Sequence, residues 1–170
     1  CKIIITGIKD GSAFTGFCSG TLLNNTRLDG SPIVLTANHC SEYSSLADLQ
    51  NWQYQFYYQS TTCSAPLLEP SKLTMLGSTA LAYSGTDNGQ SSSDFLLVLL
   101  NQRFSQPYDV TFLGWDRSTG VPSSGVCIHH PDGDIKKIST YSTPATVASY
   151  STNFPLANNH LRIRWAATAN

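Results

Sequence analysis

Short segments in which apolar and polar residues alternate, or in which apolar residues run together, recur along the chain between turn residues. Trp52–Tyr58 alternates most clearly, with aromatic side chains on one face and glutamines on the other. Phe95–Leu100 is continuously apolar, which is typical of a strand buried on both faces. The predicted strands are Lys2–Ile8, Phe17–Leu23, Ile33–Thr36, Trp52–Tyr58, Lys72–Leu76, Thr79–Tyr83, Phe95–Leu100, Val110–Trp115, Val126–His130, Ile135–Ser139, Ala145–Tyr150 and Leu161–Trp165.

This pattern predicts an all-β fold. Many short strands at a spacing of roughly 8–12 residues indicate a sandwich or a barrel. Only Ser45–Gln50 has a weak helical pattern. Pro107 and the polar stretch Asn101–Gln106 offer the best internal boundary. We therefore expect residues 1–104 to form a complete first unit and residues 105–170 to form a shorter second one.

Composition narrows the classes of function. The 170 residues contain 10 Lys+Arg and 11 Asp+Glu, so the formal net charge is -1. This balance argues against nucleic-acid binding, which normally requires a basic face. No apolar run approaches the roughly 20 residues that span a bilayer. No basic region followed by an apolar region is present at the start, so we expect any export signal to have been removed.

The cysteine pattern favours an exported protein with disulfides. There is no C-x-x-C pair, so zinc ribbons and thioredoxin-like motifs fit poorly. A Ser- and Thr-rich chain that starts at Cys1 is typical of an oxidising compartment. The odd number leaves one cysteine over, and Cys127 is either a buried thiol or is paired with another polypeptide. A metal site at His39, Cys40 and a distant cysteine is a weaker alternative, and we expect no metal and no cofactor.

His39 and Asp94 are the residues that point to catalysis. His39 follows the apolar strand Ile33–Leu35 within Thr36-Ala37-Asn38-His39-Cys40, and a general base needs such a fixed position. Asp94 opens the apolar run Phe95–Leu100, where a carboxylate costs desolvation energy unless an imidazole N–H or a similar donor pairs with it. Each residue alone also fits a structural role, but the order His then Asp matches one of the chain orders of serine-peptidase triads.

Further motifs accompany these two residues. They are Cys18-Ser19-Gly20-Thr21-Leu22-Leu23-Asn24-Asn25, Leu35–Cys40, Tyr57–Cys63, Ser93–Leu100, Gly114-Trp115-Asp116-Arg117 and Ile128-His129-His130-Pro131. On these motifs the chain resembles the chymotrypsin-like serine peptidases, and it looks most like the bacterial lysyl endopeptidases. The resemblance touches most of the chain from Cys18 to Trp165.

The resemblance implies a fold, an activity and roles for single residues. The fold would be an antiparallel double β-barrel with the active site between the barrels. His39 would be the general base and Asp94 the residue that orients it. Cys18–Cys40 would be a disulfide behind the histidine loop, and Cys1–Cys63 a second bridge. The substrate would be a protein or peptide, and cleavage after lysine is implied.

The sequence departs from the family at three places. The nucleophile should follow the aspartate by roughly 90 residues, which falls beyond Asn170. Ser123-Ser124-Gly125 comes too early and has the composition of a turn, and the oxyanion hole belongs to the missing segment as well. Near Tyr150 the lysyl endopeptidases carry a tryptophan beside the active-site histidine. Tyr150 is therefore either an aromatic residue beside that histidine or a strand residue of the barrel.

We therefore expect a secreted serine endopeptidase whose serine is supplied by a C-terminal portion of the same precursor. A nicked or truncated enzyme is favoured over a naturally inactive relative, because half a barrel leaves apolar strand edges exposed. Two other classes remain open. One is a non-catalytic binding or assembly protein on a peptidase scaffold. The other is a carbohydrate-binding sandwich that uses the aromatic row of Trp52–Tyr58.

Overall fold

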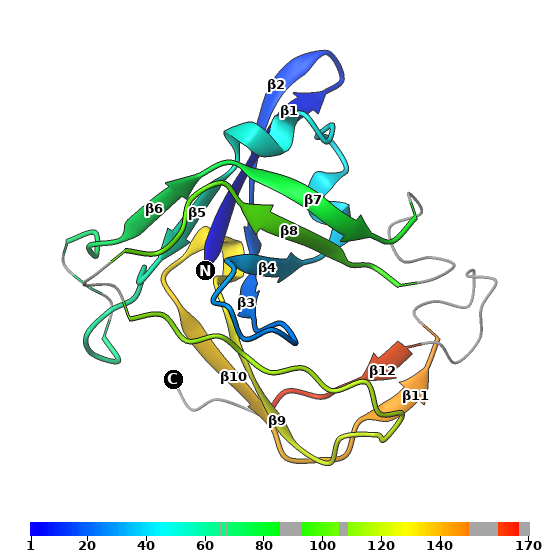
Figure 1. Ribbon diagram of the computed structural model, residues 1–170. Helices are drawn as coiled ribbons and strands as arrows, with labels where there is room; N and C mark the ends of the chain where they lie inside the picture. The colour runs from blue at the N-terminus through cyan, green and yellow to red at the C-terminus, as the bar shows by residue number, and fades with distance from the viewer. Residues whose placement is uncertain (65, 67, 86–92, 106–108, 150–159, 167–170) are drawn as a thin grey trace.

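The computed structural model describes residues 1–64, 66, 68–85, 93–105, 109–149 and 160–166 (Figure 1). Every named strand in this part of the chain pairs in an antiparallel manner, so the predicted all-β class is confirmed. Helical structure in the described residues is limited to the short 3-10 segments η1 (Asn38–Ser41), η2 (Asp48–Asn51) and η3 (Pro131–Gly133). None of these segments is long and apolar enough to cross a membrane.

The first sheet contains four strands in the order β2-β1-β5-β6. A two-residue turn at Asp10 and Gly11, both with positive φ, joins β1 to β2, as is typical of a tight hairpin. β1 then pairs with β5 over only three residues, so the far end of the hairpin extends beyond the sheet (Figure 1). The strands are β1 (Lys2–Lys9), β2 (Ser12–Ser19), β5 (Gln53–Phe56) and β6 (Leu73–Leu76).

The second sheet also contains four strands, in the order β3-β4-β8-β7. β8 is the continuously apolar segment of the sequence, and it lies between two neighbours as such a pattern predicts. Its side chains alternate between buried and half-buried positions. The strands are β3 (Thr21–Leu23), β4 (Ile33–Thr36), β7 (Ser78–Tyr83) and β8 (Leu96–Leu100).

The two four-stranded sheets share one hydrophobic core. Trp52, Tyr54 and Ile3 contribute fully buried side chains at the first sheet, and Val34 and Val98 do so from the second. The predicted aromatic face of the segment around β5 is therefore a core face. The hypothesis that these rings bind carbohydrate is wrong, because the rings of Trp52 and Tyr54 have no solvent-exposed surface on which a sugar could stack.

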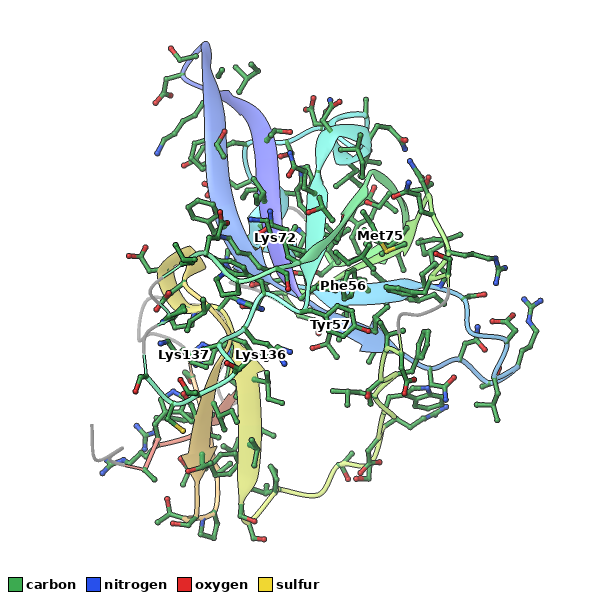
Figure 2. All side chains as sticks on the ribbon, turned by 90° about the vertical axis from the view of Figure 1, so that its left-hand side faces the viewer. Phe56, Tyr57, Lys72, Met75, Lys136 and Lys137 are labelled. Atoms are coloured by element: carbon green, nitrogen blue, oxygen red, sulfur yellow. A yellow bond between two sulfur atoms is a disulfide. The ribbon has the colours of Figure 1, made fainter. Side chains whose placement is uncertain are left out.

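The remaining strands form two hairpin sheets, β9–β10 and β11–β12. The segment around β9 and β10 is joined to the first part of the chain, since the His130 N–H donates to Ser19 Oγ at 2.8 Å and the Lys136 N–H donates to Tyr58 O at 3.0 Å. Figure 2 shows Lys136 near Tyr57, where the end of β5 meets this hairpin. The strands are β9 (Gly125–His129), β10 (Lys137–Tyr141), β11 (Thr146–Ala148) and β12 (His160–Arg162).

Three predicted segments differ from the structure. The predicted strand Phe17–Leu23 is divided at Gly20 into the end of β2 and the whole of β3. The first half of β2 is not predicted, because its residues are mostly solvent-exposed and show no burial pattern. Val110–Trp115 forms only one bridge, between Leu23 and Leu113, rather than a strand. The weak helical pattern of Ser45–Gln50 corresponds to the single 3-10 turn η2.

Gly7 lies where β1 approaches the backbone of Tyr43. The Ile8 N–H donates to Tyr43 O at 2.7 Å, and a Cβ on residue 7 would lie 1.8 Å from that same oxygen. Backbone atoms cannot yield as a flexible side chain can, so we predict that Gly7→Ala lowers the free energy of unfolding by about 1–3 kcal/mol. Urea unfolding measures this effect. Gly114→Ala, where nothing lies within 4 Å, should change it by less than about 0.5 kcal/mol, and equal effects would contradict the prediction.

Candidate active site

The pairing of β4 with β8 brings His39 and Asp94 together. Thr36, the last residue of β4, pairs with Leu96, the first residue of β8. In an antiparallel pair the end of one strand lies beside the beginning of the other. η1 follows β4 and carries His39, and Asp94 precedes β8. Two residues that lie 55 positions apart in the sequence therefore meet at the same end of the second sheet.

His39 and Asp94 make two direct contacts. The distance between His39 Nδ1 and Asp94 Oδ2 is 2.5 Å, and the backbone N–H of His39 donates to Asp94 Oδ1 at 2.9 Å. The carboxylate thus holds both the ring and the backbone of the same residue. The His39 side chain is 56% exposed and that of Asp94 is 26% exposed. The imidazole consequently presents its second nitrogen, Nε2, on the side away from Asp94.

The environment of Asp94 favours its ionised form. Burial alone would raise the pKa of this carboxyl, but hydrogen bonds from the His39 ring and backbone, its charge and the Asn38 backbone N–H together hold the pKa below its usual value. An ionised carboxylate only accepts hydrogen bonds. The hydrogen of a neutral His39 ring therefore lies on Nδ1, and Nε2 carries a free electron pair that can accept a proton.

A disulfide fixes the segment that carries His39. Cys40, which is buried, is bonded to Cys18 on β2, with their Cα atoms 6.4 Å apart. The Thr36 hydroxyl adds a hydrogen bond to Ser19 O at 2.9 Å. η1 is thus tied to the first sheet as well as to β4, which restricts the position of the imidazole.

The second expected disulfide does not form in the structure. Cys1 and Cys63 are both free thiols, and so is Cys127. Cys1 is half-buried, and its sulfur lies 3.4 Å from the position that a Cβ on Gly20 would occupy, whereas Cys63 is exposed in the segment after β5. The two sulfurs therefore lie in different environments. Cys127 is half-buried on β9 and forms no disulfide within the described residues.

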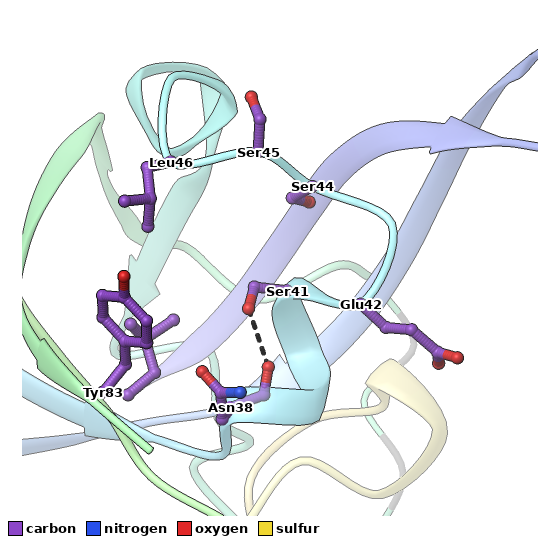
Figure 3. Close-up of a pocket in the computed structure, with 8 residues that line it drawn as sticks. Asn38, Ser41, Glu42, Ser44, Ser45, Leu46 and Tyr83 are labelled. Atoms are coloured by element: carbon purple, nitrogen blue, oxygen red, sulfur yellow. Dashed lines mark hydrogen bonds between the residues drawn. The ribbon is translucent and has the colours of Figure 1, made fainter. Parts of the chain in front are cut away.

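A cavity of about 470 Å³ adjoins η1 (Figure 3). Leu46, Tyr83 and Leu96 provide apolar surface, and Asn38 and Ser41 provide polar groups. The Ser41 hydroxyl donates to Asn38 O at 2.7 Å, as the dashed line in Figure 3 marks. The cavity thus lies directly beside the residue that precedes His39.

The other sequence candidates have different positions. Tyr150 lies outside the described residues. His129 Nε2 lies 2.9 Å from Ser139 Oγ, whereas the neighbouring His130 Nδ1 lies 3.0 Å from Asp134 O. The two histidines therefore have separate partners. No group of three or more metal-binding side chains comes together within the part of the chain that the structure describes.

His130 is a buried base whose importance the sequence did not reveal. It is 5% exposed, and burial, together with the positive charges of Lys136 and Lys2, lowers its pKa to about 4 despite the hydrogen bond to Asp134 O. The ring is therefore neutral in the folded chain at pH 6, where the ring of the unfolded chain already binds protons.

The free energy of unfolding should therefore fall as the pH drops from about 6.5 to 4, because only the unfolded state gains the proton over this range. The expected loss attributable to His130 is about 2–3 kcal/mol, as the shift of its pKa implies for a buried ring. Thermal unfolding of the chain and of His130→Gln across this range measures it. The variant should have the flatter profile, and parallel profiles would contradict the prediction.

Two comparisons with known proteins find relatives of this chain. A family model described as "Lysyl endopeptidase, C-terminal domain" matches residues 1–169. A curated protein of Pseudomonas aeruginosa named lysyl endopeptidase is 28% identical over an alignment of 167 residues, and the match covers 96% of this chain. The same match covers 33% of that protein, so the chain spans about a third of the length of its relative.

Proposed function

The chain belongs to the family of lysyl endopeptidase C-terminal domains, and from this membership we propose that it carries the general base of a serine endopeptidase. His39 is the base, and Asp94 orients it. The observation that carries the proposal is the 2.5 Å contact between His39 Nδ1 and Asp94 Oδ2, which leaves Nε2 free to accept a proton. The nucleophilic serine lies in another portion of the same polypeptide. The polypeptide that contains both portions is called the full-length polypeptide.

The reaction proceeds through an acyl-enzyme. The serine Oγ attacks the scissile carbonyl while His39 Nε2 takes the serine proton, and Asp94 stabilises the imidazolium that forms. His39 then donates this proton to the departing amine as the peptide C–N bond breaks. In the second half a water molecule attacks the ester carbonyl and gives a proton to Nε2. The ester C–O bond then breaks, the carboxylic acid product leaves, and Nε2 returns the proton to the serine oxygen. No metal or cofactor takes part in these steps.

Exposed apolar side chains support a role for a further portion of the polypeptide. On β9 and β10, Val126, Ile128 and Ile138 are 65%, 57% and 62% exposed. Ile128 pairs with Ile138, so they lie on the same face of the hairpin. Such a face is stabilised by a covering layer, and the relative is about three times as long as the matched segment. In this proposal residues 105–170 are the first part of a second barrel that the serine-bearing portion completes.

Lysine is the proposed residue on the acyl side of the cleaved bond, because the family is named for that preference. Export is also proposed, and the Cys18–Cys40 disulfide supports it, since such bonds persist in oxidising compartments.

Cleavage of matched peptides tests this function. The full-length polypeptide is incubated with peptides that differ only in having Lys, Arg or Leu before the scissile bond. We expect the lysine peptide to have the highest kcat/KM, by at least about tenfold. Efficient cleavage with no preference would overturn the lysine assignment alone. Failure to cleave any peptide or casein would overturn the peptidase function and favour a binding or assembly protein on this scaffold.

A further inference from the structure

The residue that follows Asp94 is held by a serine at the end of β7. The Ser84 backbone N–H donates to Phe95 O at 2.8 Å, and the Phe95 N–H donates to Ser84 Oγ at 3.0 Å. Ser84 is only 7% exposed. The Ser84 hydroxyl therefore extends the β7–β8 pairing by one residue and fixes the backbone directly beside the carboxylate.

Gly85, the residue after Ser84, contacts the residue that precedes His39. Asn38, which precedes His39, is 7% exposed, and its Nδ2 donates to Gly85 O at 3.0 Å. Ser84 and Gly85 are consecutive, so one short segment after β7 contacts the neighbours of both His39 and Asp94. We call Asn38, Ser84 and Gly85 the β7 clamp.

A β-bulge in β7 determines which residue lies opposite Phe95. Ala80 pairs with Val98 but Ala82 pairs with Leu97, so Leu81 is an extra residue in β7. Without this bulge Tyr83 would lie opposite Phe95 and Ser84 would lie opposite Asp94. The register shift instead brings the Ser84 hydroxyl to the Phe95 N–H. Bulges next to active sites commonly redirect a side chain in this way.

We propose that Asn38 and Ser84 are positioning residues for the His39–Asp94 pair, an inference that rests on the proposed peptidase function. Neither side chain reaches the scissile bond. Their role is to keep Oδ2 of Asp94 at hydrogen-bond distance from Nδ1 of His39, so that Nε2 stays aligned with the serine. Loss of either contact lets the two segments shift relative to each other, and displacements of about 1 Å are costly in catalysis.

Steady-state kinetics of the full-length polypeptide tests this proposal. Ser84→Ala and Asn38→Ala should each lower kcat roughly 10- to 100-fold, with KM changed less than twofold and the acidic limb of the kcat/KM pH profile displaced. Ser84→Thr, which keeps the hydroxyl, should retain most of the activity.

Ser78→Ala is the matched control. Ser78 is a buried serine at the opposite end of β7, and its hydroxyl lies 2.6 Å from the Tyr54 hydroxyl. This variant should lose thermal stability but keep the wild-type kcat and pH profile. A kcat that falls equally in Ser78→Ala and Ser84→Ala would overturn the proposal, because the effect would then be general destabilisation.

Proton NMR of the full-length polypeptide separates the β7 clamp from the proposed function, since it requires no activity. The Nδ1 proton of His39, hydrogen-bonded to a carboxylate, should give a resolved downfield resonance in the wild type and in Ser78→Ala. The resonance should weaken or disappear in folded Ser84→Ala and Asn38→Ala. If it is unchanged in both variants, the proposal is wrong, whether or not the full-length polypeptide cleaves peptides.

Discussion

Replacing His39 with alanine should lower kcat of the full-length polypeptide at least about a thousandfold, with little change in KM. The substitution removes the imidazole that is proposed to take the serine proton and to donate it to the departing amine. The His39 side chain is 56% exposed, so the variant should fold with nearly unchanged stability. Hydrolysis of a lysyl peptide under saturating conditions measures kcat, and circular dichroism checks the fold.

His129→Ala is the control for this experiment. His129 lies on β9, where its ring contacts Ser139, and it has no part in the proposed reaction. It should retain activity within a few-fold of the wild type. If His39→Ala kept wild-type activity, or if both variants lost activity to the same extent, the role of His39 as general base would be refuted.

The substitution Asp94→Asn should also be severely harmful, with a loss of roughly 10⁴-fold in kcat, as expected for a triad whose histidine adopts the wrong tautomer. An asparagine amide can donate its N–H to Nδ1 of His39, and the ring hydrogen then moves to Nε2. In this form the ring cannot accept the serine proton. The amide oxygen still accepts the His39 backbone N–H, so the local fold should persist.

Asp29→Asn tests whether the loss is specific. Asp29 is an exposed carboxylate that binds Asn25 and Ser31 in the loop before β4. Because it lies outside the proposed reaction, its replacement should leave kcat unchanged. A small effect of Asp94→Asn, comparable with that of Asp29→Asn, would contradict the assignment of Asp94 as the orienting residue.

The strands that could be predicted from the sequence are those whose alternation or run of apolar residues is visible within the strand itself. β5 was identified because its alternating aromatic side chains face the core, and β8 because both of its faces are covered. The first half of β2 was missed, since exposed residues such as Ser12 and Thr15 give no burial pattern. The prediction of a strand at Val110–Trp115 was wrong, because apolar residues form a strand only where a neighbouring strand is available for pairing.

The candidate site was predictable only in part. His39 and Asp94 were found from their motifs and their order, while the register that joins them, with Thr36 opposite Leu96, belongs to the fold. Ser84 could not be found in this way, because the bulge at Leu81 determines what lies opposite Phe95. A bulge depends on contacts between strands and leaves no reliable signal in a single sequence.

Covalent labelling of the nucleophile tests directly whether His39 activates a serine of the same polypeptide. The full-length polypeptide is treated with a fluorophosphonate probe, digested, and mapped by mass spectrometry. We expect one labelled serine, located C-terminal to Asn170, with labelling that is strongly reduced in His39→Ala. The absence of a labelled serine in a preparation that cleaves casein, or labelling that is unaffected by the loss of His39, would contradict the role of His39 as the general base.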